Sequence, residues 1–347
     1  MPTIVDEGLI STYLDRAVAE FGTNPLSARL IRRMASQLPE LFLSSALKYL
    51  ESGDESPAHR LLASMTLRHP LACEEIADPA RGTIERSITL FMRLWKVDPS
   101  FDVKLARRLP DRHGLNHCEA FNALSSYRVL DVLDETSTGR RLVPVLGHLI
   151  DSADPRMAAK ATLFIGKRIQ SAEWAARQLT RNDPSVRANA VESIWGLKSP
   201  TAQTLLEMCA GDASSHVAGN ALVGLHKLGK PGIVEQINSM ANGANHNVRS
   251  TAAWTMGRIG DSAFVDPLTE LLRDDHPEVR GAALRSLLQI RKVEAAAPEV
   301  VPVVVLEQAA VPEAVPAVEP AEDTDRVDMD IRPDGRMGGA FRYRQVG

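Results

Sequence analysis

Histidine and cysteine are the side chains of this sequence that could bind a metal ion or transfer a proton. His113, His117 and Cys118 stand close together in the segment PDRHGLNHC, at a spacing typical of metal ligands. A structural zinc site normally takes four protein ligands, and no second pair of ligands lies nearby in the sequence. We therefore expect a loop and helix-capping role for this segment, and the sequence predicts no metal site.

A second group of histidines follows a regular spacing. His216, His246 and His276 recur every 30 residues. A row of imidazoles along one edge could bind anions or respond to pH, because histidine changes charge close to neutral pH. The simpler prediction is that all three are solvent-exposed turn residues.

Motifs that define common enzyme sites are missing from the sequence. It contains no nucleophile elbow, no phosphate-binding loop, no glycine-rich dinucleotide motif after a strand and no HExxH motif. Cys73, Cys118 and Cys209 stand far apart without a CxxC pair, which fits a reducing cytosol. The sequence thus predicts no catalytic residue and no cofactor.

The composition of the 347 residues is that of an ordinary soluble protein, with 44% hydrophobic and 24% charged residues and a formal net charge of -4. Aromatic residues make up 5%, which argues against β-sandwiches and barrels. Without a long apolar run or a signal-like start, we expect a cytoplasmic protein with no membrane contact. The near-neutral charge argues against nucleic acid as the partner, although the basic stretch 81–112 could form an anion-binding face.

Helices would position the histidine, cysteine and basic residues named above. Up to residue 292, apolar residues recur at helical spacing, as in GLISTYLDRAVAEFG, and no segment alternates with period two. The sequence predicts an all-α fold in three parts. Residues 1–115 form a helical region that either continues the repeats in diverged form or caps them, 116–292 form a repeat array, and 293–347 form a tail.

An internal repeat defines the middle part. Five gap-free segments share a small residue at spacings of 29, 31, 31 and 31 residues. Each unit is a helical hairpin too small to bury its own apolar stripe, so neighbouring units must stack into an α-solenoid. We expect the array to end on an unpaired helix at 277–291. The shared small residues are Ala161, Ala190, Ala221, Ala252 and Ala283.

The repeat resembles HEAT repeats, in particular the short class first associated with phycobilisome lyases. The segments DPSVRANAVESI and HPEVRGAALRSL carry the resemblance, which covers roughly half the chain. It implies a ladder between neighbouring repeats, formed by the turn aspartate and the arginine after the valine. Ala158 and Ala218 would interrupt this ladder and leave two joints held by packing alone. The matching ladder residues are Asp183, Arg187, Arg249 and Arg280.

The tail has a different composition. Residues 293–347 hold six of the 21 prolines, 11 acidic residues and five arginines. Frequent proline blocks both helices and sheet ladders, so we expect a disordered, extended segment. Its last 16 residues have a basic and aromatic end that includes Arg342 and Tyr343. This end would serve as a tethered docking peptide, or else as a neutral disordered terminus.

These features together predict a non-catalytic interaction scaffold that binds a protein or peptide on the concave face of the solenoid. We expect the second helices of the repeats to line that face. Two alternatives are a bilin-lyase-like enzyme or subunit acting on a tetrapyrrole, as the resemblance implies, and a HEAT-like DNA-repair glycosylase. The short-repeat class points to a bacterial cytoplasm. The candidate binding residues, whose mixed charges favour a protein partner, are Arg177, Glu207, Glu235, Asn238, Asp266 and Glu270.

Overall fold

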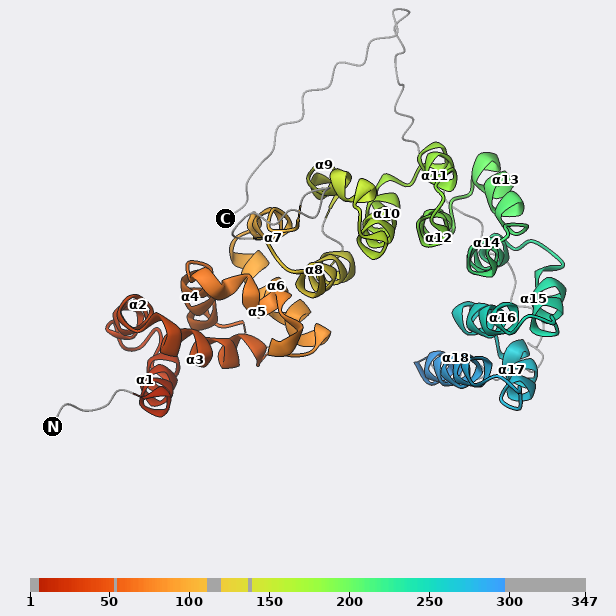
Figure 1. The fold of residues 1–347 in the computed structure, drawn as a ribbon. Helices are drawn as coiled ribbons and strands as arrows, with labels where there is room; N and C mark the ends of the chain where they lie inside the picture. The colour runs from red at the N-terminus through yellow and green to blue at the C-terminus, as the bar shows by residue number, and fades with distance from the viewer. Residues whose placement is uncertain (1–5, 53–54, 111–119, 137–138, 297–347) are drawn as a thin grey trace, which may run out of the picture. The chain divides into compact units, whose positions relative to one another are not determined.

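The computed structural model describes residues 6–52, 55–110, 120–136 and 139–296, with the backbone alone for 293–296. Every regular element in these ranges is a helix, which confirms the predicted all-α fold (Figure 1). No helix in these ranges is long and apolar enough to span a bilayer. The predictions on His113, His117, Cys118, Arg342 and Tyr343, and on the tail beyond residue 296, concern residues outside the described ranges.

The N-terminal part consists of helices that begin at local caps. Side-chain oxygens of Asp6, Ser56 and Thr83 accept hydrogen bonds from backbone N–H groups in the first turns of α1, α4 and α6. α6 also packs against α8, so these helices join the repeat array without a break in packing. The helices are α1 (Glu7–Ala19), α2 (Ser27–Gln37), α3 (Pro39–Glu51), α4 (Pro57–Thr66), α5 (Glu74–Ala77), α6 (Ile84–Val97) and α7 (Phe101–Ala106).

The repeat array has two layers, formed by the first and the second helices of successive repeats (Figure 1). Each first helix also packs on the second helix that precedes it in the chain, as α18 does on α17. Within the described residues no second helix follows α18, which begins at Pro277, where the unpaired terminal helix was predicted to begin. The first helices are α8 (Ala123–Glu135), α10 (Pro155–Ile169), α12 (Pro184–Ser193), α14 (Ser215–Lys227), α16 (His246–Ile259) and α18 (Pro277–Ala296). The second helices are α9 (Val143–Leu146), α11 (Ala172–Leu179), α13 (Pro200–Cys209), α15 (Ile233–Ala241) and α17 (Val265–Leu271).

Small residues allow the first helices to approach one another closely. The five repeated alanines predicted to share this role are all fully buried, at 0% exposure. Glycines add to the effect, because a Cβ placed on Gly166 would lie 2.4 Å from Ser193 Cβ, and one on Gly257 would lie 2.4 Å from Ser286 Oγ. Real side chains do not approach so closely, so these contacts require glycine.

The two layers differ in how tightly they pack. First helices of neighbouring repeats lie against one another along their faces, whereas neighbouring second helices touch much less. A stack that is tighter on one side curves toward that side, so the first helices line the inner side of the array (Figure 1). The expectation that second helices line the concave face is therefore wrong. The glycine and alanine contacts that shorten the distance between neighbouring repeats belong to the first helices.

Substitution of Gly257 tests this close contact. In Gly257→Ala the new Cβ would lie 2.4 Å from Ser286 Oγ and 2.8 Å from Ser286 Cα. We expect a loss of about 1–3 kcal/mol in the free energy of unfolding, measured by urea denaturation followed by circular dichroism.

The matched control is Gly281→Ala in α18, where the new Cβ would meet only Arg285 Nη1 at 3.4 Å. Because alanine favours helix more than glycine does, we expect a gain of about 0.5–1 kcal/mol. Equal effects of the two substitutions on the free energy of unfolding would contradict a special role for the α16–α18 contact.

Candidate functional site

Two arginines fasten neighbouring repeats through paired hydrogen bonds. Arg187 donates from Nε and Nη2 to the two carboxylate oxygens of Asp212, at 3.0 and 2.9 Å. Arg249 donates in the same way to Asp274, at 2.6 and 2.9 Å. The Nη1 atom of each arginine also donates to two backbone carbonyls of the turn before its own helix. Such two-pronged contacts fix geometry as well as charge.

Of the ladder residues predicted from the sequence, Arg187 and Arg249 reach the next turn, whereas the aspartate and Arg280 contact only the start of their own helix or its turn. Asp183 caps α12 by accepting from the N–H groups of Ser185 and Val186. The ladder acceptors Asp212 and Asp274 lie 25 residues after their arginines, in the turn before the next first helix. Arg280 donates to the carbonyls of residues 274 and 275.

The joints that lack a ladder arginine are not held by packing alone. At the Ala158 position, Asn189 Nδ2 donates to the carbonyl of Ala159 at 2.8 Å. At the Ala218 position, the hydroxyls of residues 215 and 251 lie 3.0 Å apart and form a hydrogen bond. Short polar side chains replace the arginine there, so the expectation of packing alone is wrong.

An aromatic and cationic cluster lies on the first-helix layer. Lys227 Nζ lies 5.0 Å and Arg258 Cζ lies 5.4 Å from the centre of the half-buried Trp195 ring, within the range of cation–π attraction. Trp195 Nε1 donates to the carbonyl of Asn220 at 2.8 Å, and Arg258 donates to Glu192 at 3.1 Å. We name Trp195, Lys227 and Arg258 the tryptophan clamp. It draws on the end of α12 and on α14 and α16.

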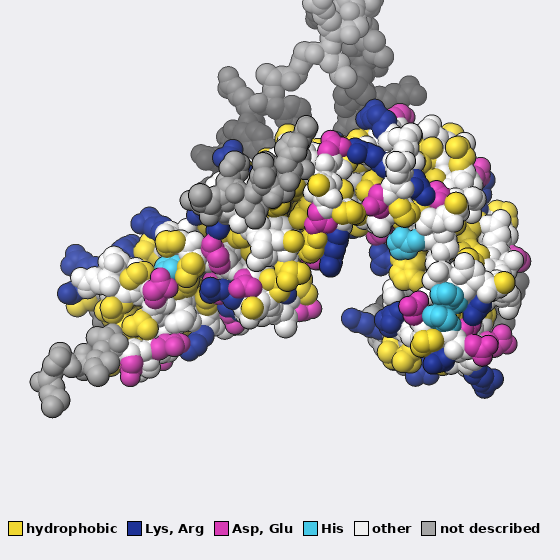
Figure 2. Space-filling model, viewed as in Figure 1, with side chains coloured by type: hydrophobic (Ala, Val, Ile, Leu, Met, Phe, Trp, Pro, Cys, Tyr) yellow, Lys and Arg dark blue, Asp and Glu magenta, His cyan; other side chains and the backbone are white. Residues whose placement is uncertain are grey.

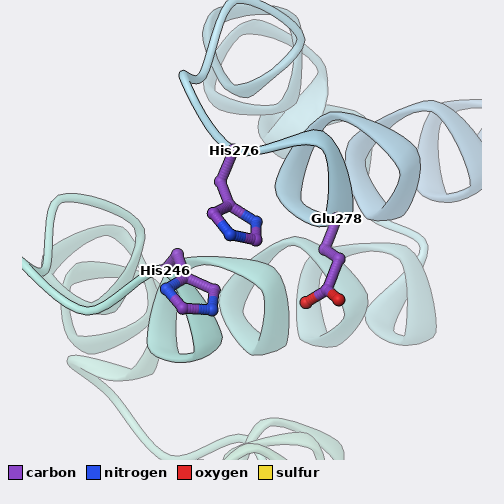
Figure 3. A group of neighbouring side chains, drawn as sticks. All are labelled: His246, His276 and Glu278. Carbon is purple, nitrogen blue, oxygen red and sulfur yellow. The ribbon is translucent and has the colours of Figure 1, made fainter.

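The three periodic histidines lie at the starts of α14, α16 and α18, and Figure 2 shows histidine side chains gathered on the first-helix side of the array. His216 is exposed as predicted, and its ring lies 5.7 Å from that of Trp254. His246 and His276 are half-buried instead, because their rings stack with centres 3.8 Å apart. Glu278 is close to both rings, so that two imidazoles and one carboxylate meet (Figure 3).

The six candidate residues lie on the second helices, as predicted, and therefore on the outer layer. Because second helices stand apart, grooves open between them. A groove of about 690 Å³ between α15 and α17 is lined by Asn238 and Glu270, and one of about 340 Å³ is lined by Glu207, which pairs with Lys230 at 2.9 Å. The structure thus brings Asn238 and Glu270 together. The other three, Arg177, Glu235 and Asp266, are exposed.

The basic stretch 81–112 is largely neutralised by N-terminal glutamates. Arg93 pairs with Glu55 at 2.8 Å, and Arg108 pairs with Glu74 at 2.7 Å. Arg86 donates to Glu51, and Arg81 and Arg86 both pair with Glu75. These ion pairs offset much of the positive charge that an anion-binding face on this stretch would need.

Sequence reasoning missed the tryptophan clamp and the grouping of His246, His276 and Glu278. Lys227 and Arg258 stand 31 residues apart, so reading exposed positions at the repeat period would have found both cations. Glu278 lies two residues after His276 and faces the neighbouring repeat. Its proximity to His246 depends on how α16 and α18 stack, which sequence distance does not reveal.

Comparisons with known proteins find one matching family model. Residues 233–314 match the family model of HEAT repeats, which supports the predicted repeats in that part of the chain. A search of curated proteins finds no match. Among solved structures, the chain is similar to human deoxyhypusine hydroxylase in complex with glycerol, with 14% sequence identity and a TM-score of 0.33, over 75% of this chain and 99% of that chain. The phycobilisome-lyase subclass stays a prediction.

The ladder predicts a pH dependence of stability. The Arg249 guanidinium lowers the pKa of Asp274 from its ordinary value of 3.8 to about 2. A carboxylate with a lowered pKa in the folded state adds stability above its unfolded pKa, and this contribution is lost as the pH falls through the folded pKa. Asp274→Asn should therefore destabilise the protein at pH 7, and its difference from wild type should shrink between about pH 4 and pH 2.

The midpoints of urea unfolding at several pH values measure the difference in stability between wild type and Asp274→Asn. Asp151→Asn is the control, because Asp151 pairs with Arg181 at the surface, where ion pairs contribute little. A difference between wild type and Asp274→Asn that stays constant down to pH 2 would show that the ladder carboxylate is not stabilised by its ionic contact.

Proposed function

We propose that this protein is a non-catalytic interaction scaffold that binds a protein or peptide segment on its first-helix layer. HEAT arrays are extended surfaces that commonly bind partners along the inner side of their curve. In this chain the first helices line that side, and the tryptophan clamp lies at their C-terminal ends. The partner is expected to contact the clamp.

The observation that carries the proposal is the arrangement of two cations on one aromatic ring. Tryptophan and arginine are the side chains that most often dominate protein interfaces. Trp195 is held by its hydrogen bond to Asn220, so its ring is fixed in place before a partner arrives. A fixed aromatic ring loses little conformational freedom on binding, which favours affinity.

The charges of the clamp indicate the chemistry of the partner. Lys227 and Arg258 are both exposed and come from successive repeats. Glu192 neutralises part of the Arg258 charge, and Lys227 adds a second positive charge beside the ring. A partner segment with an aspartate or glutamate next to an apolar side chain fits this surface, because the carboxylate meets the cations and the apolar group meets the ring.

The outer layer is the alternative binding surface. Of the residues predicted from the sequence, Asn238, Glu270 and Glu207 line grooves on this layer. The bilin-lyase-like and DNA-glycosylase alternatives rest on family resemblance alone, and we rank both below the scaffold function.

Removing the two clamp cations tests the proposal. The variant Lys227→Ala with Arg258→Ala should lose about tenfold or more of the partner captured by the full chain from nuclease-treated extracts of its source cells. Quantitative mass spectrometry measures the capture, and far-UV circular dichroism checks that helix content is unchanged.

The matched control removes two exposed cations from the outer side, in Arg177→Ala with Arg273→Ala. This variant should keep the partner. If the outer variant loses the partner and the clamp variant keeps it, binding takes place on the second helices. If wild type captures no protein at all, the scaffold function is wrong, and binding of an added bilin, followed by its absorbance, becomes the next test.

A further inference from the structure

Two imidazoles and a carboxylate from different repeats meet at the end of the array. His246 is the first residue of α16, His276 stands directly before α18, and Glu278 is in the first turn of α18. One potential ligand atom from each lies within 4.8 Å of the other two (Figure 3). Helix starts hold all three side chains, so their backbone positions are fixed by regular structure.

The surroundings of His276 support a ligand at this point. Its Nδ1 atom is buried and has no hydrogen-bond partner in the structure. A buried polar atom of this kind is costly unless something binds it. The backbone N–H of His276 donates to Asp274 Oδ1 at 2.8 Å, and the carboxylate of Asp274 also accepts a hydrogen bond from Arg249. The ladder therefore positions His276, as supporting hydrogen bonds do in metal sites.

The charge of the cluster selects a cation. The positive ends of α16 and α18 and the two imidazoles would by themselves favour an anion. Glu278 reverses this preference, because its carboxylate would repel an anion held by the two rings. Two imidazole nitrogens and one carboxylate oxygen form a donor set that suits divalent transition metals such as zinc and cobalt.

We propose that His246, His276 and Glu278 bind one divalent transition-metal ion, with Zn²⁺ as the first choice. Each imidazole donates its lone pair in the plane of its ring, and the two rings are stacked at an angle of 14°. One ring must therefore turn about its Cβ–Cγ bond when the ion binds, and neither ring is fully buried. The ion ties α16 to α18 and keeps at least one coordination position for water or for a side chain of a bound protein.

Metal titration of the full chain tests this site. The parent carries His113→Ala and His117→Ala, which removes the other pair of closely spaced histidines. Calorimetry with ZnCl₂ should show one ion per chain, and Co²⁺ should give the visible absorption bands of a low-coordinate ion with nitrogen ligands. Glu278→Gln should weaken Zn²⁺ binding by more than about tenfold, and His276→Ala should abolish it. His226→Ala, which changes a histidine outside the cluster, is the matched control and should bind as the parent does.

A second readout separates binding from folding. Zn²⁺ should raise the thermal midpoint of the parent and of His226→Ala, and should leave that of His276→Ala unchanged, because an ion that binds only the folded chain stabilises it. Far-UV circular dichroism before titration confirms that each variant is folded. A parent that binds no Zn²⁺, or a folded His276→Ala variant that binds as tightly as the parent, overturns the proposal.

Discussion

The close approach of the first helices is the constraint on which the rest of the array depends. It is made possible by alanine at one position of every repeat and by glycines such as Gly166 and Gly257, whose Cα atoms lie directly against a neighbouring serine. Larger side chains there would push successive helices apart. Because no such contacts draw the second helices together, that layer opens into grooves, and the first helices take the inner side.

Polar contacts add direction to this apolar packing. Arg187 and Arg249 each bind their own turn through backbone carbonyls and the next turn through a carboxylate. One arginine thus fixes the position of two turns relative to each other. Packing of small residues alone would not fix this position. Asp274 in turn fixes the backbone of His276. The contact that stabilises the last joint is therefore also the one that positions the histidine and glutamate cluster.

The periodicity of the sequence was sufficient to predict the repeat and its buried alanines, since both follow from residues that recur within one unit. Features that depend on how two units meet were not predictable in the same way. Asp183 matches the ladder motif, but the side chain that an arginine reaches is set by the stacking of the next hairpin. The same reason applies to the inner position of the first helices and to the meeting of Trp195 with Arg258, or of His246 with Glu278.

Hydrogen–deuterium exchange of the full chain, read out helix by helix under native conditions, tests the central claim most directly. If closely packed first helices hold the array together, the backbone amides of α12, α14 and α16 should exchange more slowly than those of α11, α13, α15 and α17. Equal protection of the two layers, or slower exchange in the second helices, would contradict the account.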